Sequence, residues 1–411
     1  MANTYLTWTP STSGTRAKWT WSGWVKKTDL TANGTLFFAG GSNSDYSKIL
    51  LQTDGKLYIS EVGGGSTVWE VQTNRLFRDP SAFYHMVFAY DSAQSTASDR
   101  LKIYINGVQE TSFSATSYPA QNRGAMWLAG GTEHRIGRDY ISQYFGGVIS
   151  HVNFSDGYAY DASVFGETDA TTGEWKIKTS PSFTLGTYGF TILKDGTTIT
   201  DQSTNSNNWS LGGGTLTKSE DCPSNVFATL NPLDTPYTNY TFSNGNNTLT
   251  STTGSGFTFS TATLGMTSGK YYWEAKAVSK SAGIDNWVIG FTSASAVNST
   301  TVPGSLVTGY GMYAYSGVIY NAGSTAYGVT YGVGDIIGIA LDLDNLKAYW
   351  SKNGVWVSSA NPSTNSGGYT ITAPVGNIGA YVPAWSWYEG DSNTGQTSYN
   401  FGNGYFGTTA V

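Results

Sequence analysis

The sequence has little cysteine, few charged residues and no long apolar segment. Its 411 residues include one cysteine, Cys222, so no internal disulfide can form and a cysteine zinc site has no second ligand. Charged residues make up 12% of the chain, about half of the roughly 25% typical of soluble proteins. No stretch approaches the roughly 18 apolar residues of a spanning helix, and the first residues lack the pattern of a signal peptide. We therefore expect synthesis in the cytoplasm and no membrane insertion.

Runs of basic residues are also absent. The 22 lysines and arginines are scattered among 28 acidic residues, which leaves a formal net charge of −6. A protein that binds nucleic acid needs a basic face to neutralise phosphates. The glycine triplets at 63–65 and 212–214 lack the lysine and the helix that a phosphate-binding loop requires. We expect no nucleic-acid partner and no cofactor.

The combinations of residues that carry hydrolytic chemistry are missing as well. Glycoside hydrolysis needs two facing carboxylates, and the only close alternation is Asp342 and Asp344, which lie on a strand that leads into a hairpin. The three histidines, His85, His134 and His151, are far apart, and no Gly-x-Ser-x-Gly nucleophile elbow occurs. Each histidine has a strand-like context, which favours a packed or surface residue. The sequence therefore predicts a protein that is not an enzyme.

Aromatic residues and glycine are abundant instead. Aromatics form 15% of the chain, and apolar and polar residues alternate with a period of two in many short segments, such as 19–25, 56–60, 84–90 and 101–105. Such alternation predicts half-buried antiparallel strands. The turn signals between strands are Asp54-Gly55, Asn106-Gly107, Asp195-Gly196 and Asn353-Gly354, dipeptides that supply the positive φ angles of tight hairpins. No helical stripe exceeds two turns, and we expect only a helical turn near residues 161–165. The predicted fold class is all-β, with two antiparallel β-sandwich (jelly-roll) domains.

The alternation of apolar and polar residues is interrupted between residues 212 and 256, where glycine, asparagine and proline are frequent. We place the domain boundary there, with one sandwich over residues 1–225 and a second over residues 226–411.

The first half resembles a laminin-G-like or concanavalin-A-like jelly roll. The segments that carry this resemblance are Trp21–Lys26, Leu36–Gly40, Asp54–Leu57, Tyr84-His85, Leu101–Gly107, Ile136–Arg138 and Tyr144–Ile149. More narrowly, the segments Arg78–His85, Asp91–Arg100 and Phe165–Gly173 resemble structural proteins of tailed phages that infect marine bacteria. The resemblance implies a virion protein.

The second half resembles a SPRY domain. Five blocks in order carry this resemblance: Ser268–Glu274, Val288–Phe291, Gly334–Gly338, Leu341–Asp344 with Lys352–Gly354, and Tyr399–Gly402. SPRY domains bind proteins or peptides through variable loops, so the resemblance implies a binding module and leaves its ligand open.

Exposed rings beside short polar side chains suit a saccharide, because sugar C–H faces stack on rings and hydroxyls bond to Asp and Asn. The densest such segment is 381–391, and the ligand-binding candidates in it are Trp385, Trp387, Tyr388 and Asp391. The polar, glycine-bearing residues 389–395 that follow predict that this loop reaches solvent. Tyr313 and Tyr315 belong to a second ring-rich stretch. The competing interpretation is that these rings pack in a core.

Laminin-G-like domains sometimes hold calcium on a rim, and Asp45, Asp139 and Asp156 are weak candidates for such ligands. Three scattered aspartates are not a metal signature, so the sequence predicts no metal site.

The combined interpretation is a non-enzymatic protein on the virion exterior, made in the cytoplasm of the bacterial host. As a short fibre, spike or appendage it would bind host surface glycan or outer-membrane protein. The alternative is a capsid or tail decoration protein that contacts only other virion proteins, and a polysaccharide depolymerase is a third possibility. The sequence has neither the heptads nor the short repeats of a fibre shaft, which favours a short globular appendage assembled as a homo-oligomer such as a trimer.

Overall fold

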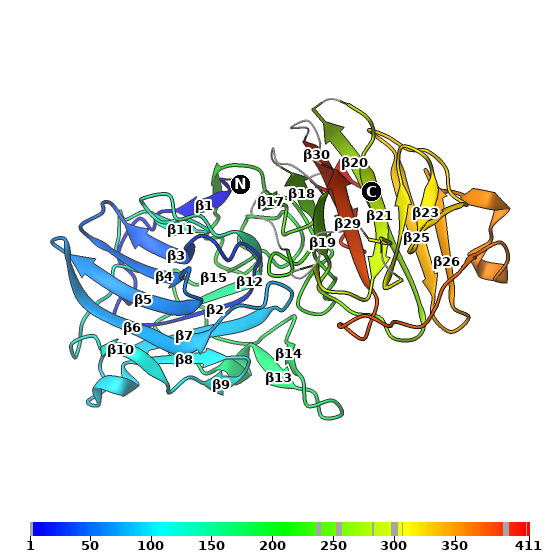
Figure 1. Ribbon diagram of the computed structural model, residues 1–411. Coiled ribbons are helices and arrows are strands. Elements are labelled where there is room, and N and C mark those ends of the chain that lie inside the picture. Colours follow the sequence, from blue (N-terminus) through cyan, green and yellow to red (C-terminus); the bar gives the residue numbers. More distant parts are fainter. Residues whose placement is uncertain are drawn as a thin grey trace. The chain divides into compact units, whose positions relative to one another are not determined.

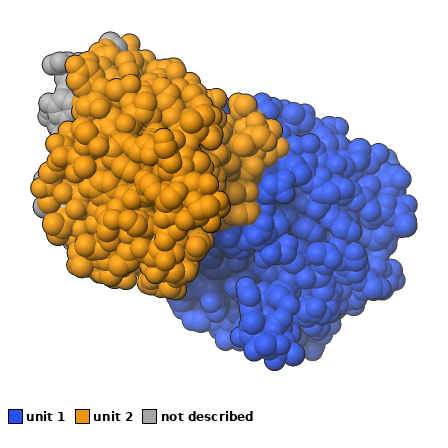
Figure 2. Space-filling model, turned by 90° about the vertical axis from the view of Figure 1, so that its right-hand side faces the viewer, with its two compact units in different colours: residues 1–226 blue, residues 227–411 orange. Residues whose placement is uncertain are grey.

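Antiparallel strands account for the regular structure of the chain in a computed structural model (Figure 1). The model describes residues 3–235, 240–251, 257–281, 283–296, 303–305, 307–388, 394–407 and 409–411. The expected all-β fold is confirmed. The chain divides into two compact units, residues 1–226 and 227–411 (Figure 2).

Two sheets form the sandwich of the first unit. In order across the first sheet the strands are β10 (Phe113–Ser117), β6 (Ser66–Leu76), β5 (Lys56–Gly63), β4 (Tyr46–Leu51), β3 (Gly34–Gly40), β11 (His134–Ile136), β1 (Tyr5–Trp8) and β16 (Ser210–Gly213). The second sheet contains β15 (Phe190–Ile192), β12 (Gly147–Asp156), β2 (Lys18–Lys27), β7 (Tyr84–Asp91), β8 (Leu101–Ile105) and β9 (Val108–Gln109). Because β1 pairs with β16, residues near both ends of this unit close its first sheet.

The alternation in β2 places Trp19, Trp21 and Val25 in the core between the sheets. Trp24 lies on the opposite face of the strand, where its ring stacks on His85. A small hairpin of β13 (Gly166–Thr168) and β14 (Trp175–Ile177) covers this outer face beside β8 and β9 (Figure 1). Short 3-10 turns cover Ala97–Asp99 (η1) and Ala162–Val164 (η2), and the second is the expected helical turn.

The second unit repeats the two-sheet plan. One sheet contains β17 (Tyr240–Ser243), β18 (Thr248–Ser251), β30 (Gly395–Asn400), β20 (Lys270–Lys280), β25 (Ile336–Asp342), β26 (Lys347–Lys352) and β27 (Val355–Trp356), with β28 (Tyr369–Thr370) paired to β26. The other contains β19 (Phe257–Thr261), β29 (Val382–Tyr388), β21 (Trp287–Thr292), β22 (Gly309–Tyr313), β23 (Val318–Tyr320) and β24 (Ser324–Ala326). A last pair is β31 (Tyr405–Phe406) with β32 (Thr409–Ala410), and 3-10 turns cover Val357–Ser359 (η4) and Pro362–Thr364 (η5).

Three of the four predicted turn dipeptides join paired strands. Asp54-Gly55 connects β4 to β5, Asn106-Gly107 connects β8 to β9, and Asn353-Gly354 connects β26 to β27. Asn106 and Gly107 have φ values of 48° and 82°, as a tight hairpin turn requires. Asp195-Gly196 follows β15, which pairs with β12, so this dipeptide does not join neighbouring strands.

The part of the chain that the structure describes contains no helix with the length and apolarity needed to cross a bilayer.

Candidate functional site

The two tryptophans predicted to reach solvent are buried. Trp385 and Trp387 lie on one face of β29, as the alternation predicts, but that face points into the core of the second unit. The indole Nε1 of Trp385 donates to Thr397 Oγ1 at 2.7 Å, and the ring of Trp387 packs edge-on against Trp287 at 4.7 Å. The prediction of an outward ring cluster is therefore wrong, because this face of β29 packs against the other sheet of the unit, to which Thr397 of β30 belongs. The polar residues that follow the strand carry no information about which way its side chains point.

Two other candidates in that segment cannot be assessed in the same way. Asp391 lies outside the described residues. Tyr388 ends β29, but its side chain is not among those that the structure describes.

Tyr313 and Tyr315 form a small ring cluster with Tyr320. The ring of Tyr313 lies 6.2 Å from that of Tyr315 and 5.7 Å from that of Tyr320, and its hydroxyl donates to Asn286 Oδ1 at 2.9 Å. Tyr315 is 58% exposed, whereas the nearby Tyr310 is buried. The structure thus brings the two candidates together and leaves one of them open to a ligand.

The three aspartates considered for calcium have separate tasks in the fold. Asp45 accepts a hydrogen bond from Gly64 N at 3.0 Å, and Asp156 accepts from Thr15 N at 2.7 Å. Asp139 is buried and accepts from the backbone of the loop that follows it. Among the described residues, no group of three His, Cys, Asp or Glu side chains is arranged to hold a metal. These carboxylates position loops.

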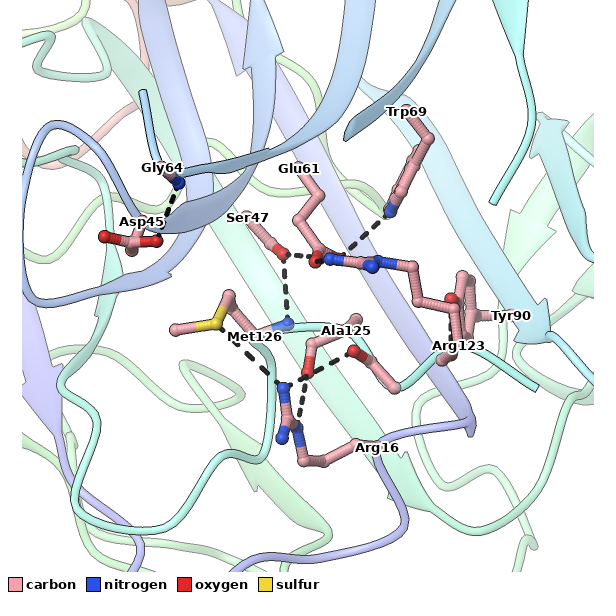
Figure 3. Close-up of polar contacts among 11 residues, drawn as sticks. Arg16, Asp45, Ser47, Glu61, Gly64, Trp69, Tyr90, Arg123, Ala125 and Met126 are labelled. Carbon is pink, nitrogen blue, oxygen red and sulfur yellow. Dashed lines mark hydrogen bonds and ion pairs between the residues drawn. The ribbon is translucent and has the colours of Figure 1, made fainter. Parts of the chain in front are cut away.

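A buried carboxylate does occur in the first unit, at Glu61 on β5 (Figure 3). Its Oε2 accepts from Trp69 Nε1 at 3.0 Å and from Ser47 Oγ at 3.5 Å, while Arg123 donates Nε to Oε1 at 3.0 Å. The guanidinium also makes an ion pair with Oε1 through its Nη2. Since both oxygens are occupied and the charge is neutralised, Glu61 anchors the loop of Arg123 to the sandwich.

The histidines sit at packed positions. His85 is buried, its Nδ1 accepts from Trp175 Nε1 at 3.0 Å, and its Nε2 lies 2.9 Å from Ser22 Oγ. Because Nδ1 accepts, the ring proton sits on Nε2 and donates to Ser22, so this pair cannot act as base and nucleophile. Burial lowers the pKa of His85 to about 3, which keeps the ring neutral at pH 7.

The outer face of the first sheet carries a cluster that sequence reasoning missed. We name Tyr5, Arg135, Arg138, Tyr140 and Tyr144 the arginine–tyrosine face. This face lies on the paired strands β1, β11 and β3. Leu6, Ile136 and Phe37 point into the core. Because side chains alternate along a strand, Arg135 of β11 and its partner Phe38 of β3 point outward.

Tyr5 anchors this face on β16. A Cβ at Gly212 would lie 2.4 Å from Cε2 of Tyr5, so the ring rests directly on the strand backbone and the position requires glycine. Above this ring, the guanidinium of Arg138 lies 4.8 Å from the Tyr5 centroid and 5.0 Å from that of Tyr144. These distances are those of cation–π contacts, and the two rings, whose centroids lie 6.1 Å apart in an edge-to-face arrangement, contact neighbouring sides of the same cation.

The loop after β11 exposes apolar surface beside these cations. Tyr140 is 43% exposed and Ile141 is 56% exposed. Arg135 lies 5.6 Å from the Tyr140 centroid and is neutralised by an ion pair with Glu133. An exposed ring on the loop that also carries Arg138 can stack on an apolar face of a ligand while that cation binds its polar groups. The sequence signal was present, because Ile136–Arg138 and Tyr144 occur in segments that carry the laminin-G resemblance, but nothing in it indicated that they converge with Tyr5.

Comparison with known proteins bears on both units. The family model described as the concanavalin A-like lectin/glucanases superfamily (Laminin_G_3) matches residues 1–165, and the SPRY domain model matches residues 270–391. A comparison with curated proteins finds no match.

Solved structures similar to the chain include SPRY domains and a pentraxin. The SPRY domain of human HERC1 is 20% identical, with 42% of this chain and 98% of that chain covered and a TM-score of 0.33. Another human SPRY domain is 19% identical, with 40% and 96% covered and a TM-score of 0.31. The heptameric SAP-like pentraxin from Limulus polyphemus is 16% identical, with 39% and 72% covered and a TM-score of 0.29. The family models, together with the sheets described above, assign the units: the chain contains a laminin-G-like (concanavalin A-like) domain followed by a SPRY domain, a combination that indicates a binding or adhesion protein.

Proposed function

We propose that the protein is a non-enzymatic adhesion protein on the exterior of a tailed-phage particle, and that its first unit binds a host surface saccharide at the arginine–tyrosine face. The observation that carries this proposal is the gathering of three tyrosines and two arginines on one sheet face, with Tyr140 and Ile141 exposed beside the cations. Aromatic and arginine side chains are the residues most enriched at binding hot spots. The resemblance to phage structural proteins supports the location on the virion.

The test compares one exposed tyrosine in each unit. Tyr140→Ala in the full chain should weaken saccharide binding, measured by calorimetry against host surface glycans, and should reduce attachment of particles to cells. Tyr315→Ala is the matched control, because Tyr315 is an exposed ring of the second unit. If Tyr315→Ala abolishes binding and Tyr140→Ala does not, the site belongs to the second unit and the proposal fails.

The proposed absence of catalysis rests on the chemistry of the first unit. Its two buried glutamates, Glu61 and Glu110, form ion pairs with Arg123 and Arg75. Prolonged incubation with host polysaccharide should therefore release no reducing ends. Release of sugar fragments would identify a depolymerase instead.

A decoration protein is the alternative for the same virion location, with other virion proteins and further copies of this chain as its only partners. The lack of heptads and short repeats in the sequence is compatible with it. Electron microscopy of particles with a label on this chain distinguishes the two, because an adhesion protein should sit where the particle meets the cell.

A further inference from the structure

We propose that Arg138 binds the carboxylate of an acidic saccharide, so that the ligands of the arginine–tyrosine face are sugars that carry a carboxylate group. This inference rests on the saccharide-binding function proposed above and names the ligand class of that same site.

The guanidinium of Arg138 is held in place by aromatic rings, but few of its N–H groups have a hydrogen-bond acceptor among the described residues. This guanidinium contacts the rings of Tyr5 and Tyr144, and the hydrogen bond that the described residues give it runs from Nη2 to Ser142 Oγ at 3.2 Å. Its Nε is buried and has no hydrogen-bond partner among the described residues. Buried donors in native proteins are nearly always paired, so an arginine with this deficit calls for an explanation.

The other six arginines of the chain are satisfied by oxygen atoms of carboxylates or of the main chain. Carboxylates bind Arg75, Arg123 and Arg135. Main-chain carbonyls accept from Arg16, Arg78 and Arg100. Arg138 differs from them because its acceptor among the described residues is a hydroxyl and its Nε is buried without a partner there.

The adjacent carboxylate does not fill this role. Asp139 Oδ1 accepts from Ile141 N at 3.0 Å and from Gln143 N at 2.9 Å, and its Oδ2 lies 3.6 Å from Lys48 Nζ. The side chain of Asp139 is thus committed to its own loop and to β4. Arg138 is partly exposed, so its terminal N–H groups remain available to an anion from outside, whereas its Nε is buried.

The geometry favours a carboxylate attached to a ring. A guanidinium presents parallel N–H donors that match the two oxygens of a carboxylate, and its contacts with two tyrosine rings reduce the entropy lost on binding. The exposed ring of Tyr140 on the same loop supplies an apolar surface for the sugar ring that carries the carboxylate. A sulfate could use the same cation, so the experiment must separate the two anions.

The test is a calorimetric titration of the full chain with a panel of glucuronate, galacturonate and mannuronate oligosaccharides. Each is compared with the same oligosaccharide after its carboxylates are reduced to hydroxymethyl groups. We expect reduction to weaken binding about 10- to 100-fold, the effect of losing a charge-assisted hydrogen bond. A sulfated neutral oligosaccharide should bind more weakly than the carboxylated one.

Variants assign the effect to Arg138. Arg138→Met should weaken binding of the acidic oligosaccharide by a similar factor and leave binding of its reduced form unchanged. Arg138→Lys, which keeps the charge but loses the paired donors, should fall between the two. Arg78→Met is the matched control, since it removes an exposed arginine that donates to a main-chain carbonyl on another part of the unit. Unchanged melting temperatures establish that the variants fold.

The outcomes distinguish failure of this inference from failure of the proposed saccharide-binding function. If reduced and acidic oligosaccharides bind equally and Tyr140→Ala weakens both, the saccharide site stands and the carboxylate inference is overturned. Preferential binding of the sulfated oligosaccharide also overturns it. If no member of the panel binds, whether neutral, sulfated or carboxylated, both the inference and the proposed function fail.

Discussion

The two units share a two-sheet plan and differ in their chemistry. All seven arginines and all three histidines lie before residue 152, so the second unit contains neither residue type. The formal charge is nevertheless the same, with 17 basic and 20 acidic residues in the first unit and 5 and 8 in the second, or −3 each. Net charge therefore says little about which unit binds an anion. The placement of individual cations says more.

The two units also differ in the type of polar group that they bury. The first unit buries complete ion pairs, such as Lys26 with Asp221 at 2.8 Å. The second uses aromatic hydroxyls and indoles: Tyr331 donates to the carbonyl of Met312 at 2.8 Å, and burial raises its pKa well above 10. The first unit thus adds a buried ion pair, on the same face of β2 as Trp24, to an aromatic core, whereas the second buries neutral hydroxyls and indoles, so the two units should lose stability under different conditions.

The largest effect should come from truncating a ring in the neutral core. Trp385→Ala removes a buried indole and its hydrogen bond to Thr397, which should cost about 3–5 kcal/mol of unfolding free energy. Calorimetry of the full chain should show one transition lowered and the other unchanged. Trp385→Phe, which keeps most of the ring volume, should cost less. A shift of both transitions would contradict the independence of the two cores.

The buried ion pair of the first unit should respond to the loss of one partner almost as strongly. Lys26→Met removes the ammonium group that pairs with the buried carboxylate of Asp221, and we expect a loss of about 3–5 kcal/mol in the first unit alone. The double variant Lys26→Met with Asp221→Leu should recover most of that loss in chemical denaturation. If the single and double variants are equally unstable, the ion pair itself stabilises the unit. The loss in the single variant would then not come from leaving the carboxylate of Asp221 without its ammonium partner.

The next largest effect should come from acid, which should lower the stability of the first unit and not that of the second. Burial lowers the pKa of His85 to about 3 and that of His134 to about 4, whereas both titrate near 6.5 in the unfolded chain. The unfolded state therefore gains protons first as the pH falls, so stability present above pH 6.5 is lost toward pH 4. Each histidine should cost about 2 kcal/mol by pH 5.

The second unit has no histidine, and the pKa values of Asp335 and Asp342 lie below the usual 3.8, so its transition should stay constant over that window. Thermal melts between pH 7 and pH 4.5 measure both transitions at once. Parallel decline of the two units would exclude the histidines as the cause.

The smallest effect should come from the exposed ring of the second unit. Tyr315→Ser removes a side chain that is 58% exposed, and its stability should change by no more than about 0.5 kcal/mol. Tyr310→Ser serves as the comparison, because Tyr310 is buried against Phe291 and Tyr381 and should cost several times more. Equal losses would mean that Tyr315 packs in solution.

Local patterns predicted the fold well because strands and hairpins follow from short-range rules. Alternation placed Trp19 and Trp21 on one face, and Asn106-Gly107 marked a reversal of the chain. The same rules could not tell that both faces of β29 are covered, since Ala384 and Ser386 are buried as well as the two tryptophans. They also could not foresee that Tyr5 and Arg138, 133 positions apart, would meet. Binding sites on sheets depend on pairing between distant strands, which alternation alone does not specify.

The pairing of β1 with β16 has a consequence for synthesis of the protein. Tyr5 leaves the ribosome 208 residues before its partner Gly213, and at about 5–20 residues per second this is a wait of about 10–40 s. The second unit repeats the situation on a shorter scale, because Thr250 of β18 waits for Gln396 of β30. During each interval an unpaired strand edge is open to other nascent chains. Slower growth at low temperature, or a chaperone that covers such edges, should therefore raise the yield of correctly folded protein.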